Sequence, residues 1–148
     1  MKKLISINPA NNKIIKEHSQ YSLDHVQEII IQSSIAQSNW KEKNINDRIK
    51  VISDIKNNIN KNLDSYAKLI TLEMGKPITE SISEIKKCIS LCEYYCQNSS
   101  NFLKPEVLDF DSGKSVIVFE PLGIILGIMP WNFPFWQVFR FAIPVLLS

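Results

Sequence analysis

The stretch Ile124-Ile-Leu-Gly-Ile-Met-Pro-Trp-Asn-Phe-Pro134 decides the fold class of this chain. Its first six residues are apolar or glycine, as expected of a strand covered on both faces in a mostly parallel sheet. Pro130 and Pro134 then stiffen a short loop, and a helical period resumes after Pro134. A buried strand followed by a loop and a helix is how a nucleotide-binding α/β layer begins. We therefore predict an α/β fold.

The residues before this stretch predict a small hairpin, three or four helices and a pair of antiparallel strands. Turn-forming and capping residues place the boundaries: Asn8–Asn12 for the hairpin turn, Ser22 as N-cap of the first helix, and Asn46 or Asp47 as N-cap of the second. Gly75 followed by Pro77 should end the second helical region. The predicted hairpin covers residues 4–7 and 13–16. The predicted helices cover 22–40, 46–74 with a break near 63, and 79–101. The predicted strands cover 107–110 and 115–120, with Asp111-Ser112-Gly113 as their turn.

The charge pattern excludes two classes of partner. The net charge is +2 and the Lys residues are spread among Asp and Glu, so there is no concentrated basic face for nucleic acid. Residues 124–147 are long enough to suggest a membrane span. Arg140 and three prolines in that range argue against a membrane span. A buried strand followed by a buried helix accounts equally well for the apolar composition.

The chain has three cysteines and nothing that resembles a secretory leader. This favours a reducing compartment, and we expect a cytoplasmic protein. Cys88, Cys92 and Cys96 recur at intervals of four on one predicted helix, which can suggest a metal site. Zinc needs four ligands and neither histidine is close in sequence, so we expect small core residues and no metal.

Asn132 is the candidate for chemistry within the proline-bounded loop. Open α/β sheets bind their ligands at the carboxyl ends of strands, where this loop would lie. A rigidly held amide donor beside a reacting carbonyl can stabilise a developing oxyanion. The alternative is that Asn132 only bonds to the backbone of its own loop.

Four ordered motifs resemble the NAD(P)-dependent aldehyde dehydrogenase superfamily, and together they cover essentially the whole chain. The segment from Phe133 to Arg140, followed by Pro144, is most similar to succinate-semialdehyde dehydrogenases. The motifs are Asn8-Pro9-Ala10, Leu72-Glu-Met-Gly-Lys-Pro-Ile78, Glu120-Pro-Leu-Gly123 and Pro130-Trp-Asn-Phe-Pro134.

The resemblance implies a fold, a reaction and site residues. The fold is the amino-terminal part of an aldehyde dehydrogenase, with oligomerisation strands at about 105–121 and the start of the nucleotide-binding sheet at about 122–148. The reaction is NAD- or NADP-dependent oxidation of an aldehyde through a cysteine thiolate and a glutamate base. Asn132 matches the oxyanion-hole asparagine, and Ile128, Met129, Pro130 and Trp131 match the loop that touches the nicotinamide side of the cofactor.

The resemblance also implies that the catalytic cysteine and glutamate lie beyond Ser148. We therefore expect the isolated chain to be inactive, and the full-length enzyme to be a homo-oligomer that acts on succinate semialdehyde. The alternative is a non-catalytic remnant that docks to a carboxy-terminal piece or to an intact homologue.

Arg140 is the only charged side chain from Pro121 to Ser148. An arginine in so apolar a segment needs a partner. Its planar fork can receive the distal carboxylate of a semialdehyde, which the resemblance favours. The alternative is a structural salt bridge to a carboxylate elsewhere in the full protein.

Overall fold

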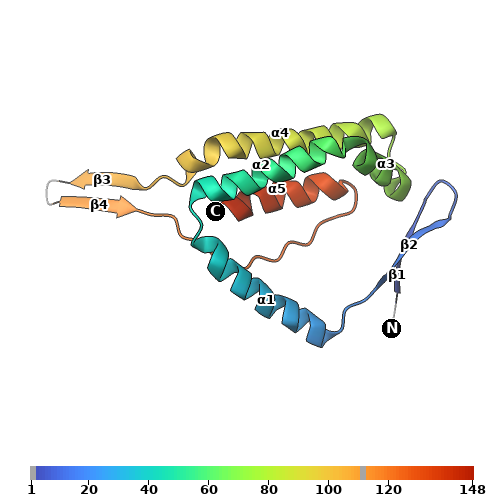
Figure 1. The fold of residues 1–148 in the computed structure, drawn as a ribbon, viewed down its shortest axis with the longest axis horizontal. Helices are drawn as coiled ribbons and strands as arrows, with labels where there is room; N and C mark the ends of the chain where they lie inside the picture. Colours follow the sequence, from blue (N-terminus) through green and yellow to red (C-terminus); the bar gives the residue numbers. More distant parts are fainter. Residues whose placement is uncertain (1–2, 111–112) are drawn as a thin grey trace.

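The computed structural model describes residues 3–110 and 113–148. Helices dominate, and two separate two-stranded hairpins extend from opposite ends of the helical part (Figure 1). The elements are β1 (Lys3–Ile7), β2 (Ile14–Ser19), α1 (Leu23–Lys41), α2 (Ile45–Lys61), α3 (Leu63–Met74), α4 (Ile78–Phe102), β3 (Glu106–Phe110), β4 (Gly113–Ile117) and α5 (Pro134–Leu147).

The core lies between α4 and the helices packed on it, α2, α3 and α5. Each of these helices contributes an apolar stripe at helical spacing. One buried cluster joins α2, α4 and α5, and a second joins α2, α3 and α4. The buried members are Ile52, Cys92, Ile143 and Leu147 in the first cluster and Ile59, Ile70 and Ile85 in the second.

Local capping signals place most helix boundaries correctly. The Ser22 side chain accepts a hydrogen bond from the His25 backbone N–H, as its predicted N-cap role requires. Gly75 ends α3 in the left-handed conformation at φ 71°. The second N-cap is Asn44, whose side chain accepts from the Asp47 N–H at 3.0 Å. The prediction of Asn46 or Asp47 was wrong because Asn44 is an equally good cap two residues earlier.

The predicted strand at 124–129 is not formed. This segment is an extended coil with Ile128 87% exposed and Leu126 83% exposed. A strand needs hydrogen-bonded neighbours, and β1 to β4 pair only within their own hairpins. The expectation of a doubly buried strand is therefore wrong for this structure, whereas the loop and the helix after it are present.

The second predicted strand differs in detail, and two helices have features of their own. Strand β4 ends at Ile117 and not at residue 120, and Asp111 and Ser112 of the predicted turn lie outside the described residues. Helix α1 buries none of its residues, and its amino-terminal part lies away from the other helices (Figure 1). Pro144 lies inside α5, which continues to Leu147.

Among the described residues, no helix has both the length and the apolarity that a membrane crossing requires.

Candidate active site

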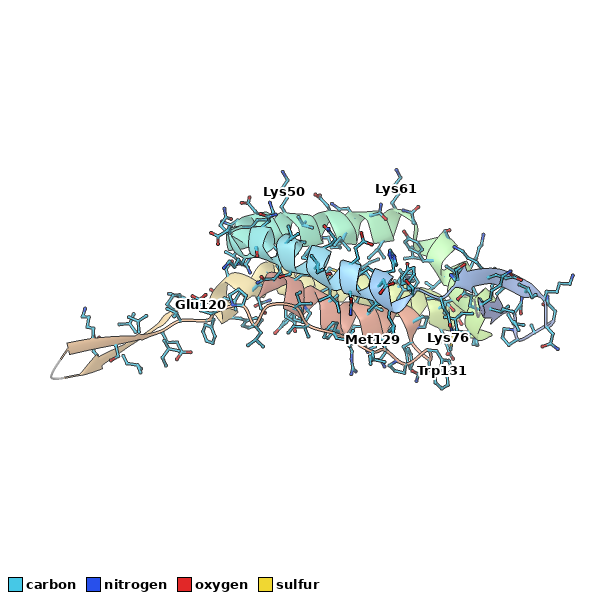
Figure 2. All side chains as sticks on the ribbon, turned by 90° about the horizontal axis from the view of Figure 1, so that it is seen from below. Lys50, Lys61, Lys76, Glu120, Met129 and Trp131 are labelled. Atoms are coloured by element: carbon cyan, nitrogen blue, oxygen red, sulfur yellow. The ribbon has the colours of Figure 1, made fainter. Side chains whose placement is uncertain are left out.

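The proline-bounded loop leads directly into α5. Residues 131–133 form bends, and α5 begins at Pro134. Pro134 suits the first helical position because its ring fixes φ and the missing N–H would have no partner there. Asn132 is exposed on this loop, and Figure 2 shows Met129 and Trp131 on the same loop with Lys76 nearby. Asn132 and Trp131 are therefore both exposed on the loop that precedes α5.

A buried carboxylate holds the start of α5. The Oε1 atom of Glu84, on α4, accepts hydrogen bonds from the backbone N–H groups of Phe135 and Trp136 at 2.9 and 3.0 Å. These are two of the N–H groups that an α-helix leaves without an internal partner. The N-cap residue, Phe133, has no side-chain acceptor. Glu84 thus supplies the missing cap from another helix, and its charge suits the positive end of the helix dipole.

Lys76 neutralises Glu84 and contacts the loop at the same time. Its Nζ lies 2.5 Å from Oε2 of Glu84, and the two side chains are 10% and 1% exposed. The same Nζ lies 3.8 Å from the centre of the Phe133 ring, a cation–π contact. One buried ion pair therefore joins the turn before α4, α4 itself and the loop that carries Asn132.

Two of the sequence motifs meet beside this pair. A Cβ atom at Gly75 would lie 3.0 Å from Cγ of Pro9, which belongs to the turn between β1 and β2. Gly75 also has φ 71°, which a side chain disfavours. The hairpin turn and the loop before Lys76 therefore pack closely, and this packing needs glycine.

The carboxyl end of α5 is held by hydrogen bonds to its last carbonyls. Trp40 Nε1 donates to the carbonyl of Leu146 at 2.8 Å, and Arg48 Nη1 donates to that of Leu147 at 3.0 Å. The guanidinium suits the negative end of the helix dipole. With Glu84 at the other end, α5 is fixed at both termini by side chains of α1, α2 and α4.

Arg140 lies on the exposed side of α5, six residues after Pro134. Among the described residues, the structure shows no ion pair for it. The cation is therefore presented outward from the same helix whose first turn adjoins Asn132.

The three cysteines belong to the core and not to a reactive centre. Cys88 and Cys92 are fully buried, and burial raises the pKa of Cys88 to about 12 and that of Cys92 to about 11. The negative charge of Glu84 adds to the effect at Cys88. Burial also raises the pKa of Cys96. Thiols held protonated are poor nucleophiles, and within the described ranges no group of three possible metal ligands is found.

The cysteine pKa values predict slow and pH-dependent labelling by a thiol reagent. In the folded chain Cys96, which is partly exposed, should react first, and Cys88 and Cys92 should react only after denaturation. Because burial raises the pKa of Cys96, the rate of its labelling should rise with pH between pH 7 and 9. Mass spectrometry of alkylated peptides measures this order. Rapid labelling of Cys92 at neutral pH in the folded chain would contradict it.

Comparison with known proteins decides the family. The model of the aldehyde dehydrogenase family matches residues 1–148. The chain belongs to the aldehyde dehydrogenase family. The chain is 36% identical over 144 residues to a succinate semialdehyde dehydrogenase [NAD(P)+], Sad, of Escherichia coli, covering 97% of this chain and 31% of that protein. It is 51% identical over 85 residues to a probable succinate-semialdehyde dehydrogenase [NADP(+)] of Synechocystis, covering 57% of this chain and 19% of that protein.

Solved structures of the family share this fold. A succinic semialdehyde dehydrogenase from Streptococcus pyogenes, solved with NADP+, superposes with a TM-score of 0.91 at 25% identity over 97% of this chain and 32% of that one. An aldehyde dehydrogenase from Brucella melitensis gives 0.93 at 26% identity over 99% and 30%. The chain thus spans about a third of the length of these relatives, which is consistent with an amino-terminal part of the aldehyde dehydrogenase fold.

The loop residues assigned to the cofactor fit part of a dinucleotide site. Ile128 and Trp131 are 87% and 79% exposed, Pro130 is exposed, and Met129 is half-buried. Exposed apolar groups of this size are suited to packing against a flat ring such as nicotinamide. Residues 128–131 would contact only the nicotinamide side of a bound NAD(P) molecule.

Glu84, Lys76 and Arg48, which hold the two ends of α5 and the loop before it, were not predicted from the sequence as residues with this role. A signal for Glu84 was present, because it falls in the same stripe of α4 as the buried residues Ser81, Ile85 and Cys88. A charged residue in a buried stripe requires a partner of opposite charge or backbone donors. That the donors come from α5, about 50 residues later, has no local signal.

Proposed function

We propose that this chain is the amino-terminal part of an enzyme that oxidises an aldehyde to a carboxylate with NAD or NADP, and that the aldehyde is succinate semialdehyde. The observation that carries the proposal is the exposed Asn132 on a loop fixed by the buried pair Glu84–Lys76. The names of the relatives, which are succinate-semialdehyde dehydrogenases, support the substrate.

Asn132 has the chemical role of an oxyanion donor in this proposal. Its amide N–H can donate to the carbonyl oxygen of an aldehyde as negative charge develops there. A donor fixed in advance costs no reorganisation during the reaction, and one such donor contributes about 3–4 kcal/mol to transition-state stabilisation. The buried cap on α5 restrains the backbone that directly follows Asn132.

The remaining chemistry is assigned to residues outside this chain. The carbonyl carbon requires a thiolate nucleophile, and Cys88, Cys92 and Cys96 are unsuited because they are packed in the core with raised pKa values. A general base is also needed to activate water for release of the acid. When bound, NAD or NADP supplies the hydride acceptor, and 128–131 would lie along its nicotinamide side.

A restored enzyme tests the proposal. It consists of residues 1–148 joined to the part of the E. coli enzyme that the match does not cover. With succinate semialdehyde and NAD or NADP, the restored enzyme should form reduced cofactor, and the 148-residue chain alone should not. Activity of the chain alone would contradict the assignment of the nucleophile to another segment. A folded restored enzyme without turnover would contradict the proposed function.

Arg140 gives a test of the substrate. In the restored enzyme, Arg140→Leu should raise KM for succinate semialdehyde about tenfold to hundredfold, since a charge-assisted bond contributes about 1.5–3 kcal/mol. KM for butanal, an uncharged aldehyde of the same length, should remain within about twofold. Steady-state kinetics with both aldehydes measures the ratio. Equal losses would instead assign Arg140 to a structural salt bridge in the full protein.

A second candidate function is a non-catalytic fragment that docks to a carboxy-terminal piece or to an intact homologue. The exposed apolar residues of 124–128 favour this candidate, because such a surface promotes association. Co-expression of the chain with the remaining part of the E. coli enzyme distinguishes the two. A stable complex without turnover supports the fragment, whereas turnover supports the enzyme.

We further propose a cytoplasmic location and a homo-oligomer in which β3 and β4 take part.

A further inference from the structure

Glu84 uses both of its carboxylate oxygens and is itself 4% exposed. Oε1 binds the backbone N–H groups of Phe135 and Trp136, and Oε2 binds Lys76. A buried carboxylate is costly unless each oxygen is paired. This residue is thus committed to the start of α5 and to Lys76, and none of its described hydrogen bonds goes to Asn132.

The chain directly after Asn132 is restrained by this one group. Phe135, three residues after Asn132, is bonded to Glu84 directly. Phe133, the next residue after Asn132, lies under the ammonium of Lys76, whose position is set by Glu84. Loss of the carboxylate would release two backbone N–H groups and the lysine together.

We infer that Glu84 is a positioning residue for Asn132. It fixes where α5 begins and keeps the Lys76 ammonium over Phe133, so that the Asn132 amide holds one orientation toward the reacting carbonyl. The inference rests on the proposed function, in which Asn132 is the oxyanion donor. Displacement of a catalytic group by about 1 Å can cost about a hundredfold in rate, so a residue with no substrate contact can control kcat.

The test compares Glu84→Gln in two forms of the restored enzyme. Glutamine keeps an acceptor oxygen for the two N–H groups but turns an amide donor toward the Lys76 ammonium. We expect kcat to fall about tenfold with KM within about twofold. In an enzyme that already carries Asn132→Ala, the same substitution should lower kcat less than twofold, since there is no amide left to position. Glu93→Gln, an exposed glutamate on the same helix, is the matched control.

A second variant covers a failure of Glu84→Gln to fold. The pair Lys76→Met with Glu84→Gln removes both charges and leaves no unpaired ion. It should show the same dependence on Asn132. Equal kcat losses with and without Asn132, or no loss in either variant, would overturn the inference. An inactive restored enzyme with the natural residues would instead refute the proposed function on which the inference rests.

Discussion

Replacing Lys76 by methionine should lower the free energy of unfolding of the 148-residue chain by about 3–5 kcal/mol. The substitution leaves the Glu84 carboxylate, whose side chain is 1% exposed, without its counter-charge. The two backbone N–H groups of α5 remain as donors, but they do not replace a full positive charge. Urea denaturation followed by tryptophan fluorescence gives the free energy of unfolding.

Two control variants separate the charge effect from loss of side-chain volume. Lys87 lies 3.9 Å from the centre of the Trp136 ring but is exposed, so Lys87→Met should cost only about 0.5–1 kcal/mol. Adding Glu84→Gln to Lys76→Met should recover part of the stability, because no unpaired charge remains buried. If Lys76→Met costs no more than Lys87→Met, the pair does not hold the loop.

Replacing Asn132 by alanine should lower kcat of the restored enzyme by a factor on the order of a hundred to a thousand. Asn132 is exposed, so the melting temperature should change little. KM for the aldehyde should also change little, because the amide bonds to charge that develops in the transition state. Steady-state kinetics measures kcat and KM, and a thermal melt measures the melting temperature. Asn57→Ala, an exposed asparagine on α2, is the control, and an equal loss there would contradict a specific role.

Features set by neighbouring residues were predictable from the sequence. The cap at Ser22 and the glycine end of α3 at Gly75 each depend on a few adjacent residues. The proline-bounded loop and the helix after it followed from Pro130 and Pro134 in the same way. The resemblance to aldehyde dehydrogenases, now established for the family, rested on four motifs that lie far apart along the chain.

Features that need partners distant in sequence were not predictable. The apolar run 124–129 has the composition of a buried strand, yet a strand forms only beside other strands, and the neighbouring segments supply none. The range of α1 was predicted from local signals, but no local signal shows that none of its residues is buried. Glu84 has a local signal as a charge in a buried stripe, whereas its bonds to α5 depend on tertiary packing.

In the proposed function, the loop of this chain lies at the reacting carbonyl of an aldehyde dehydrogenase. Single-turnover formation of reduced cofactor by the restored enzyme tests it most directly, because product release does not affect that rate. We predict that Asn132→Ala slows the single-turnover rate at least about a hundredfold, while the Kd for NADP stays within about twofold. An unchanged single-turnover rate, even with a lower steady-state kcat, would contradict the claim.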